Sequence, residues 1–337
     1  MRKAAIVILN YNGKEMLRQF LPTLLTESFF EIIIADNHSS DDSIDFLARH
    51  YPDLQVLALS QNYGYSKGYN EALARLQGAY EYFVLLNSDV KVSPLWDRSL
   101  VDFLDAHPDH VAVQPKILSF QNPNQYDYAG AGGGFIDQLG YPYCRGRILD
   151  EIEEDRGQYD DTLEVSWTSG ACFALRAEAF FEEQGFDDEF FAHMEEIDLC
   201  WRWTMAGWKL GYLGKVSVYH LGGGTLSRTS SFKTYLNMRN NLLMLYKNLH
   251  SSRFLLLFVL RMGMDSFAGL YLALTGKGDQ TKAVLKGYRD FFKMKSKIKK
   301  SKYLASKLPS QAENRRSYIN SIVIKYYLAG KKRYQEL

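Results

Sequence analysis

The sequence has few cysteines and no long apolar segment near its N-terminus. Cys144, Cys172 and Cys200 are the three cysteines among 337 residues; they are odd in number, widely spaced and lack the pairing of a metal site. A reducing compartment is the simplest interpretation of this usage. The apolar run over residues 4–9 ends in a polar turn and is too short for the hydrophobic region of a signal peptide. We therefore expect a cytoplasmic protein.

Features of two other nucleotide-binding classes are also missing. No glycine fingerprint of the dinucleotide-binding type follows the first predicted strand, and the glycine cluster at residues 130–134 precedes no clear helix. A nucleotidyltransferase that makes sugar nucleotides would require a glycine-rich, basic loop after the first strand. The turn at residues 10–13 is neither glycine-rich nor basic. We find no internal repeat. A dinucleotide-binding fold and a nucleotidyltransferase are therefore disfavoured.

The formal net charge of +1 conceals a strong asymmetry. Residues 1–229 contain 18 Lys and Arg against 34 Asp and Glu, whereas residues 230–337 contain 22 against 5. The first part should repel polyanions unless a metal intervenes, and the second should seek an anionic surface. We therefore predict a large domain over residues 1–229 and a basic, partly apolar helical region over residues 230–337.

The first hundred residues alternate between short apolar runs and helical patterns. This rhythm is typical of an α/β fold with a largely parallel sheet and helices on both faces. The expected strands are 4–9, 32–35, 54–57 and 82–86, and the expected helices are 15–27, one after 41–43, 67–76 and 94–106.

The pattern is weaker after residue 110. A strand is expected over residues 111–113, and the Gly-, Tyr- and Asn-rich stretch 122–163 is typical of loops over a site rather than core. We expect ordered structure to resume over 165–175, whose small residues 169–171 would let the backbone pass close to another group. A helix over 176–184 and two short strands, 210–213 and 216–219, complete this part.

Polar residues occupy the ends of several of these elements. Asn87, Ser88 and Asp89 follow a buried strand, and the carboxyl edge of an open α/β sheet is where ligands bind. Their oxygens could face a hard divalent cation that holds a diphosphate, although an Asx turn that closes the strand is the alternative. Asp36-Asn37 and His220 also follow strands. An N-cap or turn residue is the alternative for Asp36, and an exposed turn is the alternative for His220.

A carboxylate cluster opens a predicted helix near residue 195. Glu195 and Glu196 are adjacent and need not face the same way, because neighbours on a helix are about 100° apart. Asp198 and Arg202 are four residues apart and are expected to pair. Taken alone, the cluster would be a solvated helix start.

The order and spacing of these groups resemble the inverting family 2 glycosyltransferases of the GT-A fold, and within them the rhamnosyltransferase-type members that build cell-surface polysaccharides. The resemblance runs from about residue 3 to residue 250. It rests on residues 8–13, Asp36-Asn37, Asn87-Ser88-Asp89, Glu195 to Asp198, and His220.

The resemblance implies a nucleotide site and a metal site. Asp36 could accept the N3–H of a pyrimidine, and Tyr11 could stack on its ring. The family's Asp-X-Asp motif is Asn87-Ser88-Asp89 here, so Asp89 would be the principal ligand of Mg²⁺ or Mn²⁺, with His220 beside it. The implied nucleotide-binding residues are Asn10, Tyr11, Asp36, Asn37, Asn62, Lys67 and Asn70, and the implied sugar- and diphosphate-binding residues are Asn87, Ser88 and Asp89.

The resemblance also implies a general base. It falls on Glu196, where relatives carry Asp, and Glu195 remains a competitor. Trp167 and Gly170 are the expected acceptor-site residues. The implied activity is metal-dependent transfer of a sugar, with rhamnose favoured, from a nucleoside-diphosphate sugar to a glycan or lipid-linked acceptor. The alternative is a non-catalytic nucleotide-sugar-binding or membrane-tethering module of a polysaccharide assembly complex.

The C-terminal region combines apolar and basic stretches. Residues 254–274 are mostly apolar but contain Arg261 and Asp265, which share a face of a helix and can pair. A lysine-rich stretch follows at 293–302, and such charges favour an anionic leaflet. We expect peripheral association with the cytoplasmic face of the inner membrane and no nucleic-acid partner, although a solvated tail or a nucleic-acid patch is the alternative. Whether residues 254–274 insert in the membrane stays open.

Overall fold

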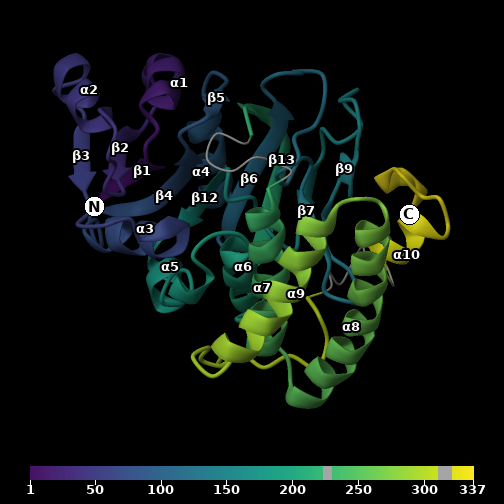
Figure 1. Ribbon diagram of the computed structural model, residues 1–337. Coiled ribbons are helices and arrows are strands. Elements are labelled where there is room, and N and C mark those ends of the chain that lie inside the picture. The colour runs from purple at the N-terminus through teal and green to yellow at the C-terminus, as the bar shows by residue number, and fades with distance from the viewer. Residues whose placement is uncertain (223–229, 310–320) are drawn as a thin grey trace.

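The computed structural model describes residues 1–222, 230–309 and 321–337. A large central sheet carries helices on both faces, and helices of the C-terminal third pack beside it (Figure 1). In chain order the elements are β1 Arg2–Asn10, α1 Lys14–Glu27, β2 Glu31–Asp36, α2 Ser43–His50, β3 Gln55–Ala58, α3 Gly64–Ala74, β4 Tyr80–Asn87, β5 Val90–Val92, α4 Trp96–Ala106, β6 His110–Ser119, β7 Gly134–Ile136, β8 Pro142–Cys144, β9 Arg147–Ile148, β10 Glu151–Ile152, β11 Thr162–Glu164, β12 Cys172–Arg176, α5 Ala177–Glu182, α6 Glu195–Met205, β13 Lys209–His220, α7 Ser231–Asn248, α8 Ser251–Leu274, α9 Gly278–Met294 and α10 Ile322–Tyr327.

The sheet order brings the ends of distant strands to one edge. The order is β11-β13-β6-β12-β4-β1-β2-β3, with β5 paired to β13. Strands β1 to β4 are parallel, β12 is antiparallel to β4 and β6, and β13 is parallel to β6. Asn10 therefore lies beside Asp36, and Leu9 lies beside Asn87. The carboxyl ends of β1, β2, β4 and β13 meet at this edge, as the sequence predicts for a mostly parallel core.

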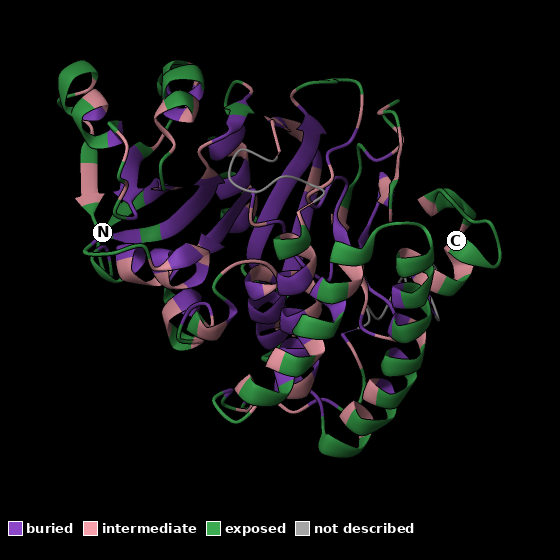
Figure 2. Cartoon of the chain, viewed as in Figure 1, coloured by how far each residue is buried: buried purple, intermediate pink, exposed green. Residues whose placement is uncertain are grey.

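Both faces of the sheet are covered and its inner strands are buried, whereas the edge strands β3 and β11 are partly exposed (Figure 2). Alternate residues of a strand point to opposite faces. Ala5 and Val7 of β1 pack in the cluster that contains α3, α5, α6 and α7, whereas Ile6 and Ile8 pack in the cluster that contains α1, α2 and α4. The predicted layering of helices on both sides is confirmed.

The stretch 122–163 is not a set of loops outside the core, and that prediction is wrong. It forms a second small sheet of order β10-β9-β8-β7, and its side chains Phe135, Tyr143 and Ile148 are buried in the main cluster. The frequent glycines interrupt the hydrophobic period and so conceal the strands. At Gly134, for example, a Cβ atom would lie 2.1 Å from the Trp167 indole, so only glycine fits there.

Order does resume after residue 165, and Cys172–Arg176 form a strand, while the small residues before it pass close to α3 and α6 as expected. One strand boundary differs from expectation. The two strands expected over 210–219 are one continuous strand, Lys209–His220, with a register shift between Leu213 and Ser217.

The C-terminal helices share buried residues with the sheet domain. Leu242 and Leu245 of α7 and Phe291 of α9 belong to the same cluster as the sheet residue Phe173. The boundary predicted at residue 229 falls within 223–229, which lies outside the described residues. The division at this boundary stays a prediction.

Candidate active site

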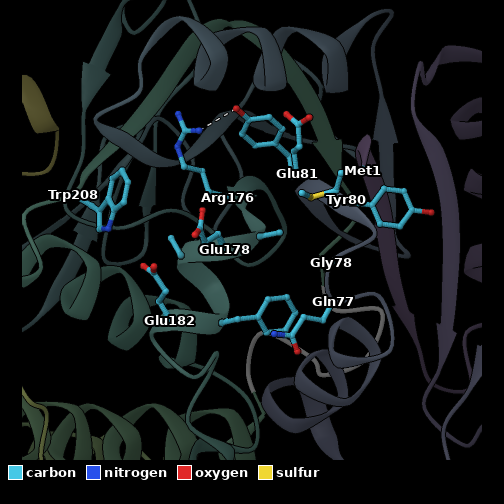
Figure 3. Close-up of a pocket in the computed structure, with 13 residues that line it drawn as sticks. Met1, Gln77, Gly78, Tyr80, Glu81, Arg176, Glu178, Glu182 and Trp208 are labelled. Carbon is cyan, nitrogen blue, oxygen red and sulfur yellow. Dashed lines mark hydrogen bonds between the residues drawn. The ribbon is translucent and has the colours of Figure 1, made fainter.

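A hollow of about 810 Å³ opens at the amino edge of the parallel strands (Figure 3). Met1 before β1 and Tyr80 at the start of β4 line it, at the opposite end of these strands from Asn10 and Asn87. Three glutamates also line it: Glu81, Glu178 and Glu182. A wall of carboxylates disfavours an anionic diphosphate. Asn10, Asp36 and Asn87 lie at the opposite, carboxyl edge.

Asn10 and Asp36 form the first cluster at that edge. Asn10 Nδ2 donates to Asp36 Oδ1 at 2.9 Å, and Ser39 donates to the same carboxylate from its backbone N–H at 2.9 Å and from its hydroxyl at 2.6 Å. Asp36 is buried, whereas Tyr11, which follows Asn10 in the chain, is 40% exposed. The Asn10 Oδ1 atom is buried and has no protein hydrogen-bond donor. Asp36 thus orients an amide whose acceptor oxygen is unused.

Gly13 links this cluster to the end of β4. A Cβ atom there would lie 2.3 Å from Asn10 Oδ1 and 3.6 Å from Ser88 Oγ. The loop after β1 therefore touches both side chains, and any larger residue would displace Asn10. The structure brings together Asn10, Asp36 and Ser88, as the resemblance implies.

The segment after β3 makes a second amide cluster. Asn37 Nδ2 donates to Asn62 Oδ1 at 3.1 Å and to the Gly64 carbonyl at 2.9 Å, and Asn37 Oδ1 accepts from the Tyr63 N–H at 2.9 Å. Asn62 Oδ1 also accepts from the Gly64 N–H. These bonds orient the start of α3 at the carboxyl edge.

Lys67 and Asn70 face a different neighbour. Asn70 Nδ2 donates to the Phe186 carbonyl and to Asp188 Oδ1, each at 2.8 Å, and Lys67 Nζ lies 3.8 Å from the Asp188 carboxylate. In this structure their polar partners belong to the turn before α6, so Asn70 ties α3 to that turn.

Asp89 and His220 meet across the β5 and β13 pairing. His220 Nε2 lies 3.2 Å from Asp89 Oδ1, and His220 Nδ1 lies 3.3 Å from Asp127 Oδ2. All three side chains are buried. Burial disfavours the charged imidazole, but the hydrogen bonds with Asp127 and Asp89 outweigh it and raise the pKa of His220 to about 10. A proton on this ring thus sits between two carboxylates.

A divalent cation could replace the proton on His220 Nε2 in this arrangement. Donor atoms that occupy neighbouring positions around one Mg²⁺ lie roughly 3 Å apart, and Asp89 and His220 meet that requirement. Asp127 would then accept the Nδ1–H of His220, as the outer carboxylates of histidine metal ligands do. Among the described residues, no group of three or more His, Cys, Asp and Glu side chains is placed to hold a metal ion by itself. Further ligands would have to come from substrate and water.

The turn before α6 has an unusual backbone. Phe191, His193 and Met194 all have left-handed φ values, of 65°, 69° and 73°. The left-handed region costs conformational free energy for residues other than glycine. They adopt it where surrounding contacts hold the backbone in place. Here the Phe191 carbonyl accepts from the N–H groups of Tyr65 and Ser66 at the start of α3, at 2.7 and 3.1 Å.

Two residues of α7 hold the same turn from the other side. Asn240 Nδ2 lies 2.9, 2.9 and 2.7 Å from the carbonyls of Phe190, Ala192 and His193, and Arg239 Nη2 donates to Phe190 O at 2.9 Å. Sequence reasoning missed both residues. The sequence gives little indication of their role, because the same helix contains several other polar residues.

The turn delivers Glu195 and Glu196 to different surroundings. Glu195 is 3% exposed, whereas Glu196 is half-buried and accepts a hydrogen bond from the Gly170 N–H. A Cβ atom on Gly170 would lie 3.8 Å from the Glu196 carboxyl carbon and 2.9 Å from the Tyr65 hydroxyl. Burial raises the pKa of Glu196 to about 7 and that of Glu195 well above its usual range.

The loop at residues 170–171 joins the two halves of the site. The Ala171 carbonyl accepts from the Asn87 N–H at 3.0 Å, while Gly170 lies against Glu196. Tyr65 spans the same loop, because its hydroxyl donates to the Gly170 carbonyl at 2.7 Å. The end of β4 and the start of α6, more than a hundred residues apart, therefore flank one short loop.

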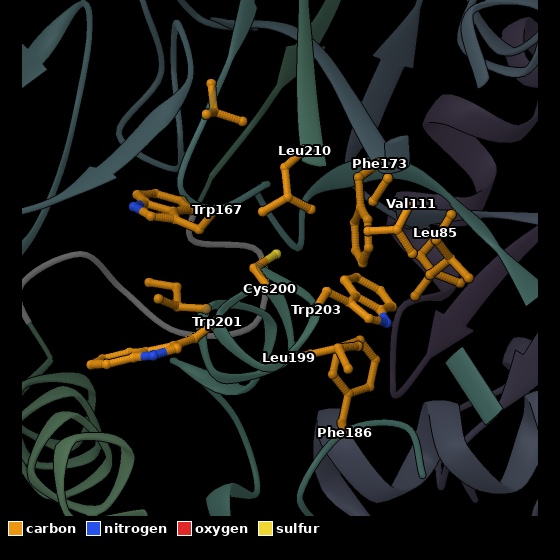
Figure 4. Packing of buried hydrophobic residues seen from close by; sticks show 14 of the residues in the cluster. Leu85, Val111, Trp167, Phe173, Phe186, Leu199, Cys200, Trp201, Trp203 and Leu210 are labelled. Atoms are coloured by element: carbon orange, nitrogen blue, oxygen red, sulfur yellow. The ribbon is translucent and has the colours of Figure 1, made fainter. Parts of the chain in front are cut away.

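Trp167 is not at the surface of this site. It is 5% exposed, and its indole Nε1 donates to the Phe135 carbonyl at 2.8 Å. Figure 4 shows it beside Cys200 in the main cluster. The expectation of an acceptor platform at Trp167 does not agree with this position. Because Gly134 has no side chain, the Trp167 ring packs directly against it in the core.

The comparisons with known proteins agree with this geometry. The family model described as glycosyl transferase family 2 matches residues 5–181. Because the match covers more than half of the chain, the protein belongs to this family of glycosyltransferases.

Two curated relatives indicate the type of glycosyltransferase that the chain resembles in sequence. The chain is 28% identical to the N-acetylglucosaminyl-diphospho-decaprenol L-rhamnosyltransferase of Mycobacterium tuberculosis over 233 residues, which cover 64% of this chain and 75% of that protein. It is 23% identical to the rhamnosyltransferase WbbL of Escherichia coli over 223 residues, which cover 64% of this chain and 82% of that protein. The expected similarity to rhamnosyltransferase-type members is confirmed.

Solved structures confirm the GT-A-type fold. The mannosyltransferase PcManGT from Pyrobaculum calidifontis, solved with GDP-Man and Mn²⁺, aligns with a TM-score of 0.52 over 87% of this chain and 88% of that chain, at 12% identity. GalNAc-T7, solved with UDP, GalNAc and Mn²⁺, aligns with a TM-score of 0.57 over 74% of this chain and 49% of that chain, at 16% identity. At these identities the likeness concerns the fold.

Proposed function

We propose that the protein transfers a sugar from a nucleoside-diphosphate donor to a glycan or lipid-linked acceptor, with inversion at the anomeric carbon, in cell-surface polysaccharide synthesis. The observation that carries this proposal is the juxtaposition around the 170–171 loop. Asn87, two residues before the candidate cation ligand Asp89, donates its N–H to the Ala171 carbonyl, and the Glu196 carboxyl group lies against Gly170. Single-displacement transfer requires such a leaving-group site and a base on opposite sides of the sugar.

Two observations support a nucleoside-diphosphate sugar as the donor: the polar residues at the carboxyl edge of the sheet and the names of the relatives. Asn10 Oδ1 has no protein donor, and it could accept the N3–H of a pyrimidine while Asp36 orients the amide. The exposed ring of Tyr11 could stack on the base. The names of both curated rhamnosyltransferases favour rhamnose as the sugar, carried by a nucleotide such as dTDP.

Asp89 and His220 would hold Mg²⁺ or Mn²⁺, and Asp127 would keep the His220 ring oriented. The cation, when bound, would neutralise charge that develops on the departing diphosphate. The residue of the chain that would act in the reaction itself is a general base beside the acceptor. Glu196 would take the proton of an acceptor hydroxyl as its oxygen bonds to the anomeric carbon, and the bond to the diphosphate oxygen breaks on the opposite face.

Asp89→Ala is the direct test of the donor site. We expect a loss of about tenfold or more in donor affinity and the loss of its dependence on Mn²⁺, because a buried charged ligand is removed. Titration calorimetry with a panel of nucleotide sugars, with and without Mn²⁺, measures both quantities. Asp53→Ala, which removes an exposed carboxylate before β3, is the matched control and should bind as the wild type. Metal-dependent donor binding of wild-type strength in Asp89→Ala would contradict the assignment.

Asn240→Ala tests whether α7 positions the base. We expect a fall in kcat of roughly tenfold with unchanged donor affinity, because the carbonyls of Ala192 and His193 lose their side-chain donor and that of Phe190 loses one of its donors. Asn241→Ala is the matched control: its amide donates to the Gly140 carbonyl instead.

Both asparagine variants should unfold more easily, by about 1–3 kcal/mol, because each leaves buried carbonyls unpaired. A positioning role predicts that only Asn240→Ala changes kcat and the acidic limb of the pH profile. Equal losses of kcat in the two variants would show a purely structural effect.

A further inference from the structure

The polarity of α8 is reversed relative to an ordinary surface helix. Its two central charged residues, Arg261 and Asp265, are 2% and 5% exposed and face the protein. Arg261 Nη1 donates to Asn241 Oδ1 at 2.7 Å, and Asp265 accepts from the hydroxyls of Tyr141 and Tyr288 at 2.9 and 2.7 Å. The predicted Arg261–Asp265 pair is confirmed, with Nε 3.4 Å from Oδ2. The charges fasten α8 to the domain.

Much of α8 is exposed (Figure 2), and the large side chains on its outward face are apolar. From residue 255 to residue 274 the only charged side chains are Arg261 and Asp265, and both are buried. This stretch is about 30 Å long. A helix on a water-exposed surface normally turns its polar side outward. The residues of this outward face, each 45–79% exposed, are Leu255, Leu256, Val259, Leu260, Met262, Phe267, Leu270, Tyr271 and Leu274.

Neighbouring elements extend the face and border it with lysines. The ring of Phe292 on α9 is 52% exposed and lies 5.6 Å from that of Phe258 on α8, and Lys295 Nζ stands 5.1 Å from the centre of the Phe292 ring. Lys277 is exposed directly after α8, and more exposed lysines follow at positions 293, 297 and 299. An apolar strip edged by cations is typical of helices that lie in a membrane interface.

We propose that the outward face of α8 docks in the plane of an anionic membrane surface, with Arg261 and Asp265 turned toward the protein. By length and composition α8 is the one described helix that could cross a membrane, with a mean hydropathy of 1.5. However, α9 packs alongside it and exposes Lys282, Lys286 and Arg289. A spanning α8 would carry these charges into the hydrocarbon, which is strongly unfavourable.

A lipid surface explains the face better than a second copy of the chain. In a two-fold dimer the same patch meets itself, so the bordering lysines would face each other and repel. An anionic leaflet attracts them instead. This inference stands apart from the proposed sugar transfer, because membrane binding is measured without any substrate.

Vesicle co-sedimentation of the full chain tests the proposal. We expect the wild type to bind vesicles of equimolar phosphatidylcholine and phosphatidylglycerol, with weaker binding to pure phosphatidylcholine and at high salt. Phe267→Glu and Leu274→Glu should each lower partition by about tenfold or more. Leu25→Glu is the matched control: it replaces an exposed leucine on α1, at the far end of the molecule in Figure 1, and should bind as the wild type.

The depth of α8 distinguishes the arrangements. Spin labels at Leu255→Cys, Phe267→Cys and Leu274→Cys should report similar shallow depths, and the three natural cysteines are buried. A depth that peaks at Phe267→Cys would show a spanning helix and overturn the proposal. So would wild-type partition in both glutamate variants, absence of vesicle binding by the folded wild type, or a light-scattering dimer that the same variants dissociate.

Discussion

Glu196→Gln is expected to lower kcat of sugar transfer by about 10² to 10⁴ fold while leaving donor affinity unchanged. The amide cannot accept the proton of the acceptor hydroxyl, but it keeps the shape of the side chain beside Gly170. Steady-state kinetics with the donor found by calorimetry gives kcat, and calorimetry gives the affinity. Loss of binding and catalysis together would indicate a disturbed fold instead.

Glu195→Gln is the matched control because Glu195 is adjacent in the chain yet only 3% exposed. We expect it to retain much more activity than Glu196→Gln. The pH profile gives a second readout. Burial raises the pKa of Glu196 to about 7, so the base is protonated and kcat/KM falls as the pH drops below that value. An activity that stays flat down to pH about 5, near the ordinary range of glutamate, or that survives Glu196→Gln, would refute the assignment.

Asp198→Ala is expected to lower the free energy of unfolding by about 3–5 kcal/mol. Asp198 is fully buried and joins α6 to α7: Oδ2 accepts from Arg202 Nε at 2.9 Å and from Lys247 Nζ at 2.8 Å, and Oδ1 accepts from Asn248 Nδ2 at 2.8 Å. Removing the carboxylate leaves two buried cations without their shared anion. Denaturant unfolding at neutral pH measures the loss.

Asp102→Ala is the comparison for that experiment. Asp102 forms an exposed pair with Arg98 at 3.6 Å on α4, so its removal should change stability by at most about 1 kcal/mol. Burial alone would raise the pKa of Asp198, but the charges of Lys247 and Arg202 lower it. Its contribution to stability is therefore present above the usual pKa of aspartate and is lost as the pH falls through the lower, folded value. Equal losses in the two variants would show that the buried network contributes nothing beyond a surface pair.

The carboxyl-edge cluster could be predicted because it depends on strand order alone. Once β1, β2 and β4 are parallel neighbours, Asn10, Asp36 and Asn87 must meet at one edge, whatever the side chains do. The Asp198–Arg202 and Arg261–Asp265 pairs were predictable for a similar reason, since helical spacing places residues four apart on one face.

The surroundings of the base could not be predicted in this way. Asn240 reaches the carbonyls of residues 190–193 across about fifty positions of sequence, and nothing in its own neighbourhood distinguishes it from Asn241. Trp167 was expected to be an acceptor platform because an aromatic ring can stack on a sugar, yet it packs over Gly134 in the core. The contacts of both side chains depend on which segment, distant in the sequence, packs against them.

By itself, the sequence determined the alternation of strands and helices, the family, and the edge of the sheet at which the polar residues gather, because these follow from local periodicity and chain order. The tertiary structure decided that Glu196 faces the 170–171 loop, that Asp127 backs His220, and that α8 turns its charges inward. Those arrangements arise from packing between segments far apart in the chain. Their stability depends on contacts among several segments, so no single stretch of sequence reveals them.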